Sequence, residues 1–121
     1  MTSDIITVKR EDSINHAIEM LLKNDITGLP VVDDDDKLVG IISEKDIMEI
    51  VFSSTAVFSK VEDYMTKEVV SFSLNDDFTK ICECLIHNNF RRVPIIKEGR
   101  LVGIISRSDI IKYLFEPIEY M

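Results

Sequence analysis

The spacing of apolar side chains along the first part of the chain predicts a β-α-β-β-α unit. Residues 5–8 form a short β-branched run that suits a strand. Five later apolar residues follow the i, i+3, i+4, i+7, i+8 spacing of a helix with one buried face, namely Ile14, Ala17, Ile18, Leu21 and Leu22. Residues 29–32 and 38–42 are apolar runs divided by a polar turn, which predicts a β-hairpin. We expect a second helix to begin after Ser43.

The same pattern occurs a second time later in the chain. The strand-like residues 69–72 match the first strand, and the apolar helix positions return as Phe78, Ile81, Cys82, Leu85 and Ile86. Residues 93–96 and 101–105 repeat the hairpin, and the hexapeptide LVGIIS at residues 38–43 returns unchanged at residues 101–106. The polar stretch 33–37 is one residue longer than its counterpart 97–100, so the alignment itself places a turn there.

This internal repeat predicts an α+β fold made of two pseudo-symmetric units. Each unit holds about 60 residues, which is small for an independent hydrophobic core, so we expect the two units to pack together as one module. We assign repeat 1 to residues 1–52, a linker to residues 53–64 and repeat 2 to residues 65–121. Pro30 and Pro94 are expected at the first residue of their strands, where no ladder N–H is lost.

Composition narrows the range of partners. The net charge of the 121 residues is -8, which argues against binding to a nucleic-acid backbone. The charge is uneven, since residues 1–64 carry 6 basic and 14 acidic side chains whereas residues 65–121 carry 8 of each. No apolar run approaches the roughly 18 residues of a membrane span, and the N-terminus lacks a signal-peptide layout. We therefore expect a cytoplasmic protein, with Cys82 and Cys84 as reduced packing residues.

Catalytic and metal-binding motifs are not evident. The sequence contains no Gly-x-Ser-x-Gly, Walker or His-Glu-x-x-His motif, and His16 and His87 have no acid or nucleophile at a helpful spacing. Residues 33–36 are four aspartates, which we interpret as a solvated hairpin tip because they lack the ligand pattern of a calcium loop. Cys82, Cys84 and His87 do not converge on one helix face. We predict no enzyme activity and no metal site.

The motif Ser-x-x-Asp follows each hairpin, as Ser43 with Asp46 and as Ser106 with Asp109. One interpretation is a helix-capping box, in which the serine bonds backbone N–H groups and the acid reaches back. The other is a ligand site, because a helix N-terminus suits a phosphate and a carboxylate can accept hydrogen bonds from ribose hydroxyls. The two roles can coexist.

The repeated order of motifs resembles the CBS domain, named after cystathionine β-synthase, here as a tandem pair or Bateman module. The resemblance rests on Met-Thr at residues 1–2 and 65–66 and on matched single residues in both copies, namely Pro30 and Pro94, Gly40 and Gly103, Ser43 and Ser106, and Asp46 and Asp109. It implies a regulatory adenosine-ligand sensor that changes conformation to control a partner or attached domain. It also implies a homodimer and no catalysis.

The resemblance further implies two clefts, each shared between the repeats. One would use Thr7, Gly28, Leu29 and Pro30 with Ser106, Arg107 and Asp109; the other would use Ser71, Arg91, Arg92, Val93 and Pro94 with Ser43, Lys45 and Asp46. The aspartate would hold ribose hydroxyls, the serine a hydroxyl or phosphate, and the apolar residue before proline would pack on adenine. The expected ligands are AMP, ADP or ATP, with S-adenosylmethionine or NADH as further candidates.

The two clefts differ in their supply of cations. Arg91 and Arg92 stand where repeat 1 has Thr27 and Gly28, so the cleft with these arginines and Lys45 is better suited to phosphate. The alternative for the arginines is a solvated helix end. Two rival functions stay open at this point: an assembly module without a small-molecule ligand that dimerises through its apolar helices, and a small metal-binding protein.

Overall fold

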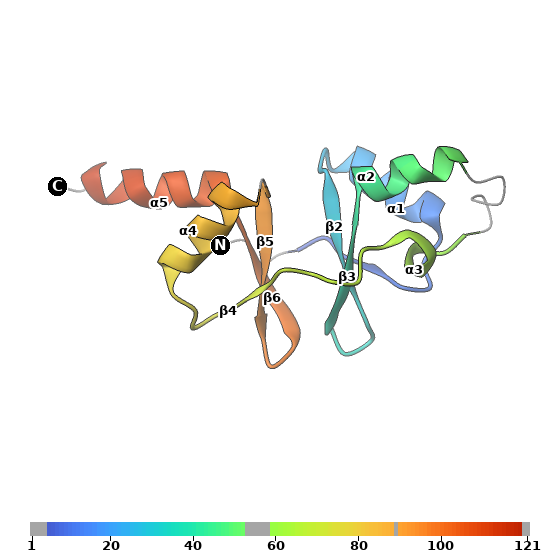
Figure 1. Cartoon of the computed structure of the whole chain (residues 1–121), viewed down its shortest axis with the longest axis horizontal. Helices are drawn as coiled ribbons and strands as arrows, with labels where there is room; N and C mark the ends of the chain where they lie inside the picture. The colour runs from blue at the N-terminus through green and yellow to red at the C-terminus, as the bar shows by residue number, and fades with distance from the viewer. Residues whose placement is uncertain (1–4, 53–58, 89, 120–121) are drawn as a thin grey trace. The chain divides into compact units, whose positions relative to one another are not determined.

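The computed structural model describes residues 5–52, 59–88 and 90–119. The chain folds as two compact units, of which the first is Ile6–Val69 and the second contains Val70–Met121 (Figure 1). In each unit the helices lie on one side of that unit's own sheet, as Figure 1 shows. Residues 53–58 of the predicted linker lie outside the described residues, and residues 59–69 belong to the first unit. The repeat boundaries stay a prediction.

The first unit contains a three-stranded sheet in the order β1-β2-β3. Its elements are β1 (Val8–Lys9), α1 (Ile14–Lys23), β2 (Gly28–Val32), β3 (Leu38–Ser43), α2 (Glu44–Met48), the 3-10 helix η1 (Glu49–Phe52) and α3 (Val61–Tyr64). Strand β1 runs parallel to β2 with Val8 opposite Val31, and β2 runs antiparallel to β3 with Gly28 opposite Ser43. Helix α3, within the predicted linker, was not predicted.

The second unit repeats this arrangement in the order β4-β5-β6. Its elements are β4 (Phe72–Ser73), α4 (Phe78–His87), β5 (Arg92–Lys97), β6 (Arg100–Ser106) and α5 (Arg107–Glu119). Strand β4 is parallel to β5, and β5 is antiparallel to β6 with Arg92 opposite Ser106. The predicted α+β fold with two β-α-β-β-α repeats is therefore confirmed.

Each unit buries its own apolar cluster between the helices and the sheet. The buried residues of the first cluster are Val8, Ile14, Ala17, Leu21, Leu29, Val31, Ile42 and Val61. Those of the second are Ile81, Cys84, Leu85, Val93 and Ile95. Helices α1 and α4 start at capped residues, since Ser13 Oγ accepts the His16 N–H at 3.1 Å and Asp77 Oδ1 accepts the Thr79 N–H at 2.9 Å. Such caps satisfy N–H groups that the helix leaves unpaired.

Some details of the predicted pattern are wrong. Leu22 and Ile86 are 77% and 71% exposed, because the i+8 position lies about 80° around the helix from the first residue of the pattern. On α4 the buried cysteine is Cys84, while Cys82 is half-buried at the rim. The prolines are the third residues of β2 and β5, not the first. Pro30 is tolerated there because β1 pairs only from Val31 onward.

The two hairpins turn in different ways. In the second, Lys97 pairs with Arg100, and the two residues between them have positive φ, 54° at Glu98 and 79° at Gly99. In the first, Asp33 Oδ1 accepts the N–H groups of Asp35 at 2.8 Å and Lys37 at 3.0 Å. These bonds lower the pKa of Asp33 below its ordinary value, and the bond from the Lys37 N–H has the largest effect. The aspartate run therefore contains a turn-forming residue and is more than solvated charge.

The segment that follows α3 lies against β3. Ile41 N–H donates to the Thr66 carbonyl at 2.9 Å, and Thr66 N–H donates to the Ile41 carbonyl at 2.8 Å. Gly40 permits this approach, because a Cβ at Gly40 would lie 2.7 Å from Met65 Sδ and 3.0 Å from the Thr66 carbonyl oxygen. The Met-Thr pair at residues 65–66, which the sequence places at the start of repeat 2, therefore packs on the first unit.

We expect Gly40→Ala to destabilise the protein by about 1–2 kcal/mol, because the Met65 side chain and the backbone of Thr66 must both shift. Gly28→Ala is the matched control, since its added Cβ meets nothing closer than 3.7 Å. Urea unfolding of both variants measures the difference. Equal stability of the two variants would contradict this packing.

Candidate functional site

Ser43 and Asp46 form a reciprocal cap at the start of α2. The Asp46 Oδ2 atom accepts the Ser43 N–H at 2.9 Å and the Ser43 hydroxyl at 2.9 Å, while Ser43 Oγ accepts the Asp46 N–H at 3.3 Å. The other carboxylate oxygen, Oδ1, accepts the hydroxyl of Thr66 at 3.1 Å. The capping interpretation of this motif is confirmed, and the Thr66 contact is one that the sequence did not predict.

Ser106 and Asp109 repeat the cap at the start of α5. Asp109 Oδ2 accepts the Ser106 N–H at 2.8 Å, and Ser106 Oγ accepts the Asp109 N–H at 3.1 Å. Burial would raise the pKa of Asp109, but the hydrogen bonds from the Ser106 N–H and hydroxyl outweigh it, and the pKa lies below its ordinary value of 3.8. The carboxylate is therefore held in its charged form, which is the form that accepts hydrogen bonds from hydroxyl groups.

The start of each of these helices also binds the loop before the preceding hairpin. Glu44 N–H donates to the Thr27 carbonyl at 3.0 Å, and Arg107 N–H donates to the Arg91 carbonyl at 2.9 Å. Together with the serine caps, these bonds pair two of the first three helical N–H groups in each copy, and the third has no partner among the described residues. Most of the helix donors that phosphate would use are therefore already bonded, and phosphate binding there stays a prediction.

The strand register places two predicted site segments side by side within each unit. Gly28 is opposite Ser43, and Arg92 is opposite Ser106. Thr7 and Ser71 are half-buried residues just before β1 and β4. Leu29 and Val93 are 0% and 1% exposed and belong to the two cores, so contact with adenine would need their backbone. Pro30 and Pro94 are also buried. The combination of residues from different repeats stays a prediction.

The predicted cations are in different environments. The Arg107 guanidinium donates to the Phe90 carbonyl at 2.8 Å and to the Leu85 carbonyl at 3.0 Å, which ties α5 to the end of α4. Arg92 is half-buried, and its buried Nε atom has no hydrogen-bond partner within the described parts of the chain. Arg91 and Lys45 are exposed. Arg92 therefore has unused bonding capacity, while Arg107 serves the fold.

The family model of the CBS domain matches residues 1–53 and 61–116, which is most of the chain and covers both repeats. The chain belongs to the CBS domain family. The predicted tandem CBS pair is confirmed, and each compact unit described above contains one β-α-β-β-α CBS repeat.

Relatives with similar sequences include larger proteins. The chain is 33% identical to protein MJ1225 of Methanocaldococcus jannaschii over 94% of its own length and 41% of that protein. It is 41% identical to inosine-5'-monophosphate dehydrogenase of the same organism over 90% of its length but only 21% of the enzyme. The chain thus spans less than half of these two relatives.

Solved structures show the same fold. The structure of CBSX2 from Arabidopsis thaliana in complex with AMP has a TM-score of 0.85 and 28% sequence identity to this chain, covering 97% of this chain and 93% of that one. The CBS-pair architecture is thus shared over nearly the whole length of both chains.

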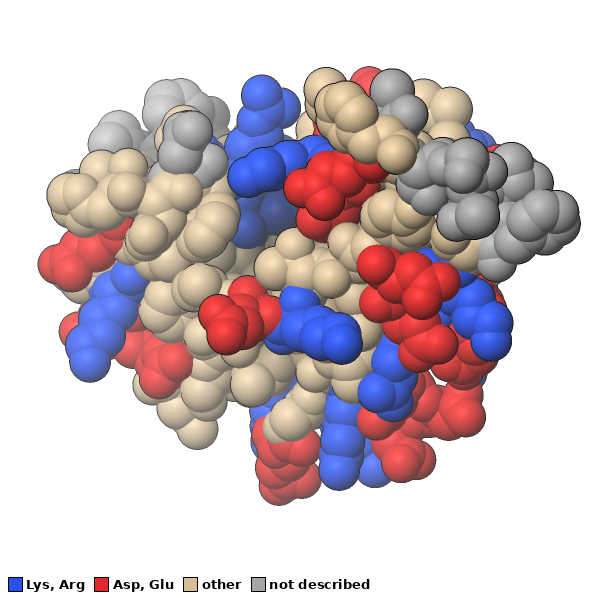
Figure 2. All heavy atoms as spheres, turned by 45° about the vertical axis from the view of Figure 1, so that its right-hand side comes forward, with Lys and Arg blue, Asp and Glu red and all other residues tan. Residues whose placement is uncertain are grey.

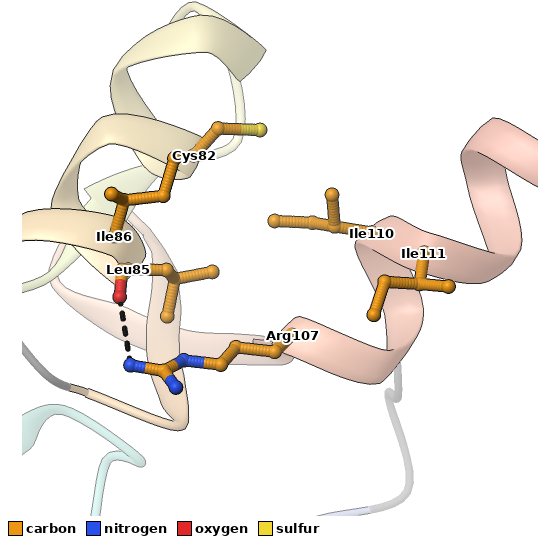
Figure 3. Close-up of a pocket in the computed structure, with 6 residues that line it drawn as sticks. All are labelled: Cys82, Leu85, Ile86, Arg107, Ile110 and Ile111. Atoms are coloured by element: carbon orange, nitrogen blue, oxygen red, sulfur yellow. Dashed lines mark hydrogen bonds between the residues drawn. The ribbon is translucent and has the colours of Figure 1, made fainter.

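The second CBS repeat also carries an apolar groove that the sequence did not predict. It has a volume of about 410 Å³ and is lined by Cys82, Leu85, Ile86, Arg107, Ile110 and Ile111, from α4 and α5 (Figure 3). The rings of Phe78 and Tyr113 lie 5.0 Å apart and also join these helices. The apolar positions Cys82, Leu85 and Ile86 of the predicted helix were the sequence signal of this surface. Of the residues assigned to the CBS ligand clefts, only Arg107 lines it.

Other kinds of site find little support in the residues that the structure describes. On the face drawn in Figure 2, acidic and basic side chains are interspersed, so no continuous basic surface is seen there. Among the described residues, no three His, Cys, Asp or Glu side chains are grouped as a metal site requires. None of the helices in the described ranges is long and apolar enough to cross a bilayer.

The capped Asp109 gives a testable pH dependence. Because its pKa is lower in the folded state than the ordinary 3.8, its hydrogen bonds stabilise the protein above that pH, and this contribution is lost as the pH falls through the folded-state value. We expect the free energy of unfolding of Asp109→Asn to decrease less than that of wild type below about pH 4. Ser106→Ala should show an intermediate decrease. Urea unfolding from pH 2.5 to 6 tests this. Parallel pH profiles for wild type and Asp109→Asn would contradict the assignment.

Proposed function

We propose that the chain is a non-catalytic regulatory module that binds an adenosine nucleotide, with AMP as the first ligand to test. The observation that carries the proposal is the duplicated Ser-x-x-Asp, which in each unit lies beside the strand that begins at Gly28 or Arg92. The AMP complex of CBSX2, with its 28% identity and nearly full coverage, supports an adenosine ligand. The free cysteines Cys82 and Cys84 support a reducing, cytoplasmic location.

The two aspartates would provide the contacts to ribose. A charged carboxylate can accept both vicinal hydroxyls of a ribose, as the acid does in dinucleotide sites. Asp109 is suited to this, since its Oδ1 has no hydrogen-bond partner among the residues described and its lowered pKa keeps it charged. We assign Asp46 the same role, with Thr7, Ser71 and the two serines as further polar contacts.

The arginines of the second repeat favour a ligand with phosphate. The unpartnered Arg92 Nε and the exposed Arg91 can provide charged donors, and Lys45 adds a third cation. In the first repeat the equivalent residues are Thr27 and Gly28, and Arg107 is bound to backbone carbonyls. We therefore propose AMP, ADP or ATP for the cleft with Arg91 and Arg92. For the other cleft we propose a ligand that needs less positive charge, such as S-adenosylmethionine or NADH.

Regulation would follow if nucleotide binds one arrangement of the module better than another. A ligand can shift a conformational equilibrium only by its difference in affinity for the two states. The partner of such a switch would be another protein or an attached domain, since the relatives MJ1225 and inosine-5'-monophosphate dehydrogenase are larger than the matched region. The chain would then act as the sensing part.

We expect AMP to raise the melting temperature of the wild-type protein, and Asp46→Asn to weaken AMP affinity by about tenfold or more because a charged acceptor is lost. Isothermal titration calorimetry measures the affinity. Asp63→Asn is a matched control, since Asp63 Oδ2 accepts the Lys60 N–H at 2.9 Å, as Asp46 Oδ2 accepts that of Ser43, but Asp63 is outside the predicted site. Equal losses in both variants would assign the effect to folding.

A thermal series with ADP, ATP, S-adenosylmethionine and NADH compares the other ligands.

A second candidate function, assembly into a homodimer, is favoured by the groove between α4 and α5. The lining residues Ile86 of α4 and Ile111 of α5 are 71% and 66% exposed. Tyr113 and Leu114, also on α5, are each 60% exposed. Exposed apolar side chains gathered on one surface often mark an interaction site. Dimerisation and nucleotide binding are compatible, so assembly alone would explain the protein only if no adenosine compound binds.

We expect Ile86→Glu to reduce the dimer fraction, because it places a charge in an apolar contact. Lys112→Glu, an exposed position on α5 outside the groove, should leave the fraction unchanged. Sedimentation equilibrium over a range of concentrations measures both. A wild-type monomer throughout, or equal dimer fractions in wild type and Ile86→Glu, would contradict assembly through this surface.

A further inference from the structure

The Asp46 carboxylate has fewer free acceptor positions than its predicted role requires. A carboxylate offers about four lone-pair positions on its two oxygens. Three are occupied within the first unit, two on Oδ2 by the N–H and hydroxyl of Ser43 and one on Oδ1 by the hydroxyl of Thr66. One position is left, whereas the two vicinal hydroxyls of a ribose need two. A ribose bound through both hydroxyls must therefore displace one of these donors.

Thr66 is the donor that can leave at least cost. The two Ser43 bonds are part-buried, so the loss of either would leave a part-buried Ser43 donor without its partner. The Thr66 bond is exposed, and its hydroxyl can rotate to water without leaving a buried group unpaired. The geometry thus separates two fixed donors from one exchangeable donor on the same carboxylate.

Thr66 also belongs to the segment that joins the two units in sequence. Its backbone pairs with Ile41 of β3 through hydrogen bonds of 2.9 and 2.8 Å, and the adjacent Met65 packs where Gly40 has no side chain. The first unit ends at Val69, and the chain continues into the second unit at Val70. A change at the Thr66 hydroxyl therefore acts on the segment that leads to the second repeat.

We propose that Thr66 is a latch on the ligand-binding carboxylate of Asp46: its hydroxyl occupies Oδ1 without ligand, and nucleotide ribose replaces it, which loosens residues 65–66 from β3. This inference rests on the proposed function, because it takes Asp46 as a ribose ligand. It assigns Thr66 as a regulatory residue that lowers ligand affinity and couples occupancy of Asp46 to the connection between the units. The contact arises from residues 20 positions apart in sequence.

The test compares Thr66→Val, which removes the hydroxyl and keeps the shape, with Thr66→Ser, which keeps the hydroxyl. We expect Thr66→Val to bind AMP roughly three- to tenfold more tightly than wild type, because the competing hydroxyl is gone. That change in affinity corresponds to the net contribution of one hydrogen bond. Thr66→Ser should bind as wild type does. A role that was only structural would weaken or not change the affinity of Thr66→Val, so either result overturns the latch.

Amide hydrogen exchange separates the latch from the proposed function. We expect AMP to speed exchange at the Ile41 and Thr66 amides of the wild-type protein, and Thr66→Val to show faster exchange at Ile41 and position 66 without AMP. Asp46→Asn without AMP should resemble Thr66→Val. Equal AMP affinity and equal exchange in wild type and Thr66→Val would overturn the latch while leaving nucleotide binding intact. No AMP binding by wild type or Thr66→Val would overturn both.

Discussion

The structure depends on a hydrogen bond made twice, between the first N–H of the helix after each hairpin and the carbonyl just before that hairpin. Glu44 bonds Thr27, and Arg107 bonds Arg91. Each bond ties the start of the hairpin's first strand to the start of the helix that follows the second strand. The serine and the aspartate at the start of that helix therefore lie beside Gly28 or Arg92. Because the hairpin and the helix are also joined through Ser43 or Ser106, local geometry alone sets the positions of the serine and the aspartate.

That constraint explains how the capping residues could also serve the proposed ligand site. The aspartate must stay charged and correctly oriented to hold a cap, and a charged, oriented carboxylate is also what a ribose requires. The serine donors take one carboxylate oxygen and leave the other to a third group. In the first unit that third group is Thr66, and in the second no described residue takes this place on Asp109. The motif is thus a structural element that uses one carboxylate oxygen for the cap and leaves the other outside it.

The sequence predicted the repeats, the hairpins and both caps because these depend on local periodicity and on motifs spaced a few residues apart. It misplaced features that depend on neighbours far away in sequence. The prolines are tolerated at the third strand position because β1 and β4 are short and pair only from the residue after each proline. Cys84 is buried in place of Cys82 because the covered face of α4 is rotated from the expected stripe. The Thr66 contact needs Gly40 and the path of the chain after α3, although both residues belong to motifs that recur in the sequence.

The two repeats share a backbone geometry but differ in the residues at matching positions near their caps. The position opposite the capping serine holds Gly28 in one copy and Arg92 in the other. The first helical residue is Glu44 in one and Arg107 in the other. Arg107 donates to the carbonyls of Phe90 and Leu85 and so ties α5 to the end of α4, whereas Arg92 Nε has no partner among the described residues and Arg91 is exposed. A pseudo-symmetric backbone therefore carries unequal charge at its two caps, and under the proposed function the two clefts would differ in the ligands they prefer.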